Sequence, residues 1–134
     1  MSKSDENWTA TVYLLDAPKD IEKKIKRAQT DSDNAVRYDV QAKPGISNLM
    51  DIFAAVTDKS HETIEREYAD KGYGAFKKDV ADAVVSVLEP IQQRYEEMIG
   101  APELDEILTQ GAEKARAKAA VTYKKVLHAI GLYR

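Results

Sequence analysis

The most chemically suggestive residues of this sequence stand at its start, where a lysine lies between two hydroxyl side chains. Lys3 is flanked by Ser2 and Ser4, and Met1 precedes them. An ammonium group and two hydroxyl donors in a polar loop can stabilise negative charge on phosphate groups. By itself, this four-residue pattern is equally typical of a methionine followed by small polar residues. Its meaning therefore depends on the rest of the chain.

Few other groups in the sequence could support catalysis. It contains no P-loop, no dinucleotide-binding glycine motif and no Cys–His pair. His61 and His128 lie far apart in the sequence, and we expect each to be a partly buried structural side chain. Acidic pairs such as Glu96-Glu97 are typical of solvated helix surfaces rather than of acid–base chemistry. No metal site is predicted.

Composition indicates a globular chain in a reducing compartment. The 134 residues are 43% hydrophobic and 32% charged, which suits a single domain of ordinary size. Cysteine is absent, and no run of residues is apolar enough to predict a membrane span or a secretory signal. We expect a cytoplasmic protein with no membrane partner. The net charge of −3 excludes a general polyanion binder, although residues 19–27 are locally rich in lysine.

The spacing of apolar residues in the first third predicts one helix between two extended segments. Residues 9–15 are β-branched and apolar, which favours a short strand or an extended arm. A helix then begins near Pro18, with Ile21 and Ile25 on its buried face. The polar run at 30–34 predicts a turn, and the alternation of apolar residues within 35–43 predicts extended chain.

The remaining sequence predicts four further helices. Pro44-Gly45 opens the first of them, and Ser60 caps a short second one. A long helix from about 75 to 99 has a sustained apolar stripe and contains Pro90, where we expect a kink. The last helix, from about 103 to 130, has small residues on its apolar side. The predicted fold is an all-α helical bundle with a short extended N-terminal arm.

Five segments, in order along the chain, carry a family resemblance. They are Met1-Ser2-Lys3-Ser4, the stretch from Asp16 to Ser32, Lys43-Pro44-Gly45-Ile46-Ser47-Asn48-Leu49, the stretches Gly72–Lys77 and Leu88–Gln92 within one long helix, and Gly111–Ala115. Met-Ser-Lys-Ser resembles the second signature of class I aminoacyl-tRNA synthetases, usually written Lys-Met-Ser-Lys-Ser. The whole set resembles the C-terminal part of bacterial tryptophanyl-tRNA synthetases, and it spans nearly the whole chain.

The resemblance implies an ATP-binding role for the first four residues. Lys3 would be the catalytic signature lysine, and Met1, Ser2, Lys3 and Ser4 would contact ATP, which the full-length enzyme uses with magnesium. The first signature lysine, the nucleotide-binding sheet and the tryptophan pocket of the family have no counterpart in this sequence. We therefore expect this chain alone to bind no cofactor and to be catalytically incomplete.

The resemblance also implies that most of the chain recognises tRNA. Residues 1–16 would be a remnant of the catalytic domain, and residues 17–134 a helical anticodon-binding domain. The candidate tRNA contacts combine the basic ridge, the turn that follows it and two nearby cations: Lys19, Lys23, Lys26, Arg27, Asp31, Arg37 and Lys43. Lysines there would contact phosphates, and splayed anticodon bases would be read by fixed polar groups.

Three partners follow from this interpretation. They are tryptophan tRNA, the missing N-terminal catalytic half, and a second copy of the chain, because apolar surface around Val12, Leu14 and Leu15 would be left uncovered. We expect a homodimer or a larger self-associated species. The alternative is a stand-alone, non-catalytic helical module, derived from a synthetase, that binds RNA or protein.

Overall fold

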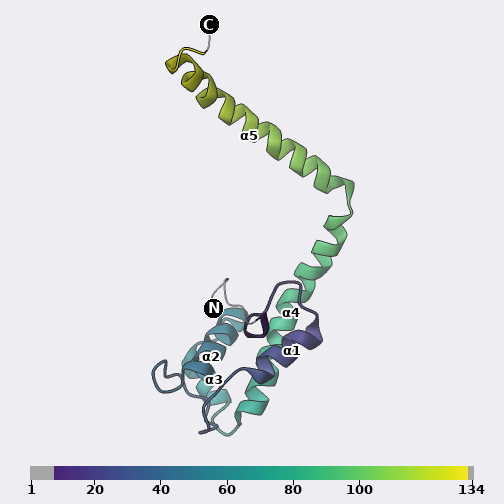
Figure 1. Ribbon diagram of the computed structural model, residues 1–134. Helices are drawn as coiled ribbons and strands as arrows, with labels where there is room; N and C mark the ends of the chain where they lie inside the picture. The colour runs from purple at the N-terminus through teal and green to yellow at the C-terminus, as the bar shows by residue number, and fades with distance from the viewer. Residues whose placement is uncertain (1–7, 133–134) are drawn as a thin grey trace. The chain divides into compact units, whose positions relative to one another are not determined.

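The computed structural model describes residues 8–132, and all the regular structure in that range is helical (Figure 1). A single 3-10 turn, η1, is followed by five α-helices: η1 (Trp8–Ala10), α1 (Pro18–Arg27), α2 (Pro44–Thr57), α3 (His61–Glu67), α4 (Tyr73–Ile99) and α5 (Pro102–Ala129). The all-α prediction is confirmed for these residues. None of these helices is long and apolar enough to cross a membrane.

Contacts divide the chain into two compact units, with the division inside α4. Unit 1 is Met1–Gln92 and unit 2 is Gln93–Arg134. Unit 1 holds η1, α1, α2, α3 and most of α4, whereas unit 2 holds the end of α4 and all of α5. The functional division expected between residues 16 and 17 is a different one and stays a prediction.

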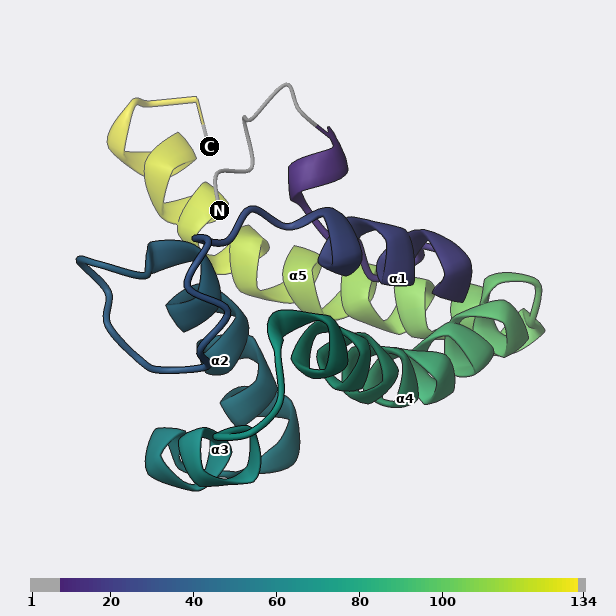
Figure 2. The same ribbon diagram turned by 90° about the horizontal axis from the view of Figure 1, so that it is seen from below.

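The core of unit 1 is built from one face of each of its α-helices. Ile21 of α1, Ile46 of α2, Ile64 of α3 and Phe76 of α4 are all fully buried. Edge-to-face contacts join Phe76 to Phe53 and tie the aromatic part of this core together. Figure 2 shows α1–α3 and the first half of α4 arranged around this interior. These four helices therefore form one rigid support for the loops between them.

Helix ends follow the signals that the sequence predicted. Proline occupies the first turn of α1, α2 and α5, where its missing N–H group removes no helical hydrogen bond. Ser60 caps α3, since its side chain accepts a hydrogen bond from the Thr63 N–H group at 3.3 Å. Helix α4 continues through Pro90 to Ile99.

The strand considered for residues 9–15 is absent from the structure. Trp8–Ala10 form a 3-10 turn, and the following residues take an irregular path into a turn closed by the Asp16 N–H group and the Tyr13 carbonyl at 3.1 Å. The Gln92 side chain donates hydrogen bonds to the carbonyls of Leu14 and Asp16 at 2.8 and 2.9 Å. A strand needs a neighbouring strand to pair with, and residues 8–132 include none.

The alternation predicted for 35–43 is only partly realised. Val36 is buried in the core, and Tyr38 packs against it, but Val40 is 60% exposed. The cause is the turn chemistry of Asp39, whose carboxylate accepts hydrogen bonds from the N–H groups of Gln41 and Ala42. The chain therefore turns away from the core before Val40.

Helix α5 has no buried residue. Apolar residues recur along it at spacings of four, four and three, a period that keeps them on one side of a straight helix. The members of this line are Leu104, Leu108, Ala112, Ala115, Ala119, Tyr123, Val126 and Ile130. Unit 2 therefore carries an apolar face with no covering element within the unit.

Candidate functional site

The basic ridge predicted on the first helix is present and faces solvent. Lys19, Lys23, Lys26 and Arg27 are all exposed on α1, on the side opposite the buried Ile21 and Ile25. Lys23 forms only an exposed ion pair with Asp20 at 3.2 Å, and a pair of that kind is weak. The ridge can therefore offer its charges to a partner.

One lysine of α1 has a different, structural role. The Lys24 side chain is 6% exposed, and its ammonium lies 2.6 Å from the Asp16 carboxylate. It also lies 4.9 Å from the centre of the Tyr13 ring. Lys24 thus anchors the segment before α1.

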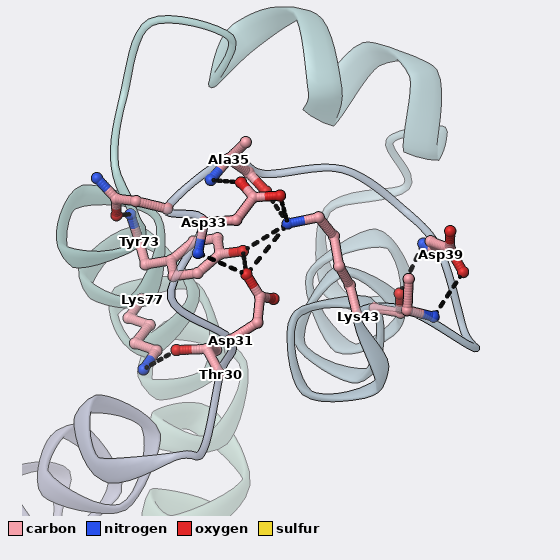
Figure 3. Close-up of polar contacts among 11 residues, drawn as sticks. Thr30, Asp31, Asp33, Ala35, Asp39, Lys43, Tyr73 and Lys77 are labelled. Carbon is pink, nitrogen blue, oxygen red and sulfur yellow. Dashed lines mark hydrogen bonds and ion pairs between the residues drawn. The ribbon is translucent and has the colours of Figure 1, made fainter.

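The turn that follows α1 is attached to α2 and α4 by an ion cluster around a buried lysine, shown in Figure 3. Lys43, the residue before α2, is 3% exposed, and its ammonium lies 2.6 Å from Asp33 and 3.2 Å from Asp31. It also donates hydrogen bonds to the Tyr73 hydroxyl at 3.0 Å and to the Ala35 carbonyl at 3.3 Å. A single cation therefore holds both carboxylates of the turn.

Tyr73 completes this Lys43 cluster (Lys43, Asp31, Asp33 and Tyr73) from the start of α4. Its hydroxyl donates a hydrogen bond to Asp31 at 2.7 Å. This bond lowers the pKa of Asp31 to about 2, assisted by the Asp33 N–H group and Lys43 and opposed by burial. Burial would lower the pKa of Lys43, but its hydrogen bonds to Asp33, Tyr73 and Asp31 raise the pKa above its ordinary value. Lys43, Asp31 and Asp33 therefore all stay charged at neutral pH.

Two further contacts hold the same turn against α4. Asn34 adopts a left-handed backbone with φ of 58°, and its side-chain oxygen accepts a hydrogen bond from the Tyr73 N–H group at 2.8 Å. A Cβ at Gly72 would lie 2.6 Å from the Asn34 side chain, so a larger residue there would displace the amide that accepts this hydrogen bond. Lys77 donates to the Ala28 carbonyl at 2.8 Å and to the Thr30 hydroxyl at 3.1 Å. Residues 28–35 are thus fixed at both ends.

A pocket of about 430 Å³ opens beside the basic ridge. It is lined by Thr9, Ala10 and Val12, by residues of α1 and α2, and by Ala28 and Gln29, which follow α1. Its lining includes the apolar Ile25, Leu49 and Ile52, together with three cations and one carboxylate: Lys23, Lys24, Arg27 and Asp20. Apolar surface next to positive charge can receive a planar, anion-bearing group.

The predicted contact residues fall into two groups in the structure. Lys19, Lys23, Lys26, Arg27 and Arg37 are exposed. Asp31 and Lys43 instead bind each other, and a phosphate could reach the Lys43 ammonium only if it left its partners. A direct tRNA contact by these two residues stays a prediction. The signature residues Met1, Ser2, Lys3 and Ser4 lie outside the described residues.

The sequence interpretation missed the roles of Asp33, Tyr73 and Lys77 in supporting the turn. The contacts of Tyr73 and Lys77 join positions 30 to 49 residues apart, which no local spacing signals. His61 is the partly buried histidine that was expected, paired with Asp51 at 3.0 Å and stacked on Tyr38. His128 is exposed, so the same expectation was wrong for it. In residues 8–132, no three His, Asp or Glu side chains are placed to hold a metal ion.

Comparison with known proteins identifies the family. A family model described as "tRNA synthetases class I (W and Y)" matches residues 1–89. The chain belongs to this family. The tryptophan–tRNA ligases of Bacillus anthracis and Bacillus subtilis are 52% and 50% identical to it over all 134 residues. The predicted relationship to bacterial tryptophanyl-tRNA synthetases is thereby confirmed.

The chain spans about two fifths of the length of the curated relatives it matches, 41% in each of these two cases. A crystal structure of tryptophanyl-tRNA synthetase from Mycoplasma pneumoniae matches 98% of this chain and 42% of its own. Its TM-score is 0.78 at 29% sequence identity. The helical arrangement is therefore that of synthetases, and it corresponds to their C-terminal portion.

Proposed function

We propose that this chain is part of an enzyme that attaches tryptophan to its tRNA with consumption of ATP. The observation that carries the proposal is the identity of about one half, over every residue of the chain, to proteins named tryptophan–tRNA ligase. Within that enzyme, the helices of this chain would bind tRNA. The enzyme would act in the cytoplasm.

The basic ridge on α1 is the tRNA-binding surface in this proposal. Its exposed cations would contact phosphates, which gives affinity without sequence information. The pocket beside Lys23 and Arg27 offers apolar surface on which an unpaired base can lie. Asp31 and Lys43 would act indirectly, by holding the turn that follows the ridge.

The signature residues would serve the catalytic half of the enzyme. Lys3 would bind ATP phosphates and stabilise the charge that develops on them, supported by Ser2, Ser4 and the Met1 backbone, with ATP bound together with magnesium. Residues 1–16 would belong functionally to the catalytic domain, and residues 17–134 would form the tRNA-binding domain. The partners are tryptophan tRNA and the N-terminal catalytic half.

The ridge is tested by reversing two of its charges. Lys23→Glu with Arg27→Glu should weaken binding of the chain to tryptophan tRNA by at least tenfold near 0.1 M salt, measured by fluorescence anisotropy. The slope of log affinity against log salt should become less negative by about 2, or about one unit for each lost contact. Arg66→Glu with Lys78→Glu is the matched control, since both residues are exposed in the same unit. Equal losses in the two variants, or none in the first, would show that the ridge is wrongly assigned.

The division of labour is tested by recombining the parts. The chain alone should give no tryptophan-dependent exchange between ATP and pyrophosphate, because a signature lysine acts only on a substrate held by the catalytic fold. Mixing it with a separately made N-terminal half should restore charging of tryptophan tRNA. Exchange by the chain alone, in a preparation free of host synthetase, would overturn the division.

A further inference from the structure

Charge is strongly segregated along unit 2, and the ridge on α1 does not account for it. Residues 96–113 contain six acidic residues and no basic one, whereas residues 114–134 contain six basic residues and no acidic one. The basic set is Lys114, Arg116, Lys118, Lys124, Lys125 and Arg134. A solvated helix surface ordinarily mixes both signs, so a run of this kind needs a further explanation.

Three of these lysines lie on one side of α5. At 100° per residue, Lys114, Lys118 and Lys125 fall within an arc of roughly 40°, and they span about 16 Å along the helix. All three are exposed. Within the described part of the chain, none of them forms an ion pair with a carboxylate. We call Lys114, Lys118 and Lys125 the α5 lysine row.

Helix stability does not explain the row. Cations favour a helix when they lie in its last turn, but Lys114 and Lys118 lie in the middle of α5 (Pro102–Ala129). Residues four apart face each other on a helix, so Lys114 and Lys118 repel one another. Neither residue has an acidic side chain three or four positions before it or after it. An external anion would remove this repulsion.

The neighbouring apolar face argues for RNA rather than for a lipid surface. A helix that lies in a membrane interface carries large apolar residues beside its cations. Beside the first two lysines of the row, the apolar line consists instead of Ala112, Ala115 and Ala119, which have little area to insert. A row of cations spaced along a helix suits the repeated phosphates of a nucleic acid backbone.

We propose that the α5 lysine row is a second tRNA contact, which binds the phosphate backbone through Lys114, Lys118 and Lys125. This inference rests on the proposed function, because it takes the partner to be tRNA. It is separate from the basic ridge, which belongs to the other unit. The acidic residues 96–113 repel phosphates, so they restrict the contact to the part of α5 from Lys114 onward.

The test compares the lysine row with two cations elsewhere on the same helix. Lys114→Gln with Lys118→Gln should weaken binding of the whole chain to tryptophan tRNA by about tenfold, or roughly threefold for each contact. The salt slope should become less negative by about 2. Arg116→Gln with Lys124→Gln removes the same charge from positions about 100–180° around α5 from the row, and it should change affinity by less than about twofold. Far-UV circular dichroism should show unchanged helix content in both variants, because all four side chains are exposed on a helix that has no buried residue.

Each outcome distinguishes a local tRNA contact on α5 from another explanation of the lysine row. Equal losses in the two α5 variants would show a diffuse effect of net charge and would overturn the proposal. No loss in Lys114→Gln with Lys118→Gln, beside a loss in the ridge variant, would overturn it while leaving the proposed function intact. No loss of tRNA affinity in any of the variants, the ridge variant included, would contradict both this proposal and the proposed function. Binding to phosphatidylserine vesicles that depends on Lys114 and Lys118, with unchanged tRNA binding, would assign the row to a membrane surface instead.

Discussion

Lys43 shows how a residue chosen for its charge can be used for structure. Its ammonium is almost completely removed from water and is compensated by Asp33, Asp31 and the Tyr73 hydroxyl. Such a buried cation adds little net stability, but removing it leaves its partners without compensation. The Lys43 cluster therefore acts by fixing the position of the turn beside the ridge.

Replacing Lys43 should destabilise unit 1. Lys43→Met keeps the volume of the side chain but leaves two carboxylates close together, and we expect a loss of about 2–4 kcal/mol in the free energy of unfolding. Urea denaturation followed by circular dichroism measures it. Lys78→Met, at an exposed position of α4, should change this value by less than about 0.5 kcal/mol. A similar, small effect for both variants would contradict the structural role of Lys43.

The pKa of Asp31 predicts an acid-sensitive unit 1. The hydrogen bond from Tyr73 lowers the pKa from 3.8 to about 2 in the folded state, so folding favours the ionised form. The resulting stabilisation is complete above about pH 5 and is lost as the pH falls from about 5 to 1. Asp31→Asn should be less stable than the original chain at pH 6 but should lose less stability between pH 4 and pH 2.5. Urea midpoints measured at pH 6, 4 and 2.5 test this, with Asp82→Asn as the exposed control. The same dependence of the midpoint on pH in all three proteins would refute it.

At the scale of elements, α4 has two environments along its length. Its apolar line is buried at Phe76, Val80, Val84 and Leu88, but Ile91 beyond them is 45% exposed. The predicted stripe therefore continues further than the core that it serves. The sequence periodicity indicates which side of the helix is apolar, but it does not show where the covering helices end.

Replacement by alanine should change stability in opposite directions at two glycines, Gly45 and Gly111. A Cβ at Gly45 would lie 2.0 Å from the Gln29 carbonyl oxygen, so Gly45→Ala forces α2 away from the end of α1 and should cost about 2 kcal/mol. Gly111 lies inside α5 with nothing within 4 Å, so Gly111→Ala should increase helix stability by about 0.5–1 kcal/mol. Thermal unfolding followed at 222 nm compares them. A rise in melting temperature for Gly45→Ala would contradict the close approach.

At the scale of the whole molecule, both units leave large apolar side chains exposed to solvent. Leu108 is 61% exposed and Ile130 is 60% exposed on the apolar line of α5. In unit 1, Leu14 and Leu15 are 62% and 55% exposed, as the sequence predicted, whereas Val12 of the same segment is partly buried and packs against the core. Surfaces of this kind are normally covered by another element or another chain. The catalytic half is the covering partner that the proposed function supplies.

The chain alone should therefore self-associate. We expect a dimer or a larger species in sedimentation velocity at tens of micromolar protein, because apolar burial favours association. Leu108→Glu with Val126→Glu charges the apolar line of α5 and should shift the chain towards monomer. Gln110→Glu with Ala120→Glu makes the same change of charge on other sides of the helix and should not. A monomer in the unmodified chain at high concentration would be evidence against this behaviour.

The sequence by itself determined the helices, their caps and the charges of the basic ridge. These features depend on neighbours three or four residues apart, such as Ser60 with Thr63 or Lys23 with Arg27, so local spacing reveals them. The five matching segments likewise identified the family before any fold was known. Sequence alone therefore predicted both the class of structure and the protein family.

Only the tertiary structure decided which charges are available to a partner. Lys23 and Lys43 are chemically identical, yet one is exposed and the other is enclosed by Asp31, Asp33 and Tyr73. The difference arises from contacts up to 42 residues apart, whose geometry depends on how α2 and α4 pack. The desolvation of a charge depends on every atom around it, and no pattern along the chain specifies that environment.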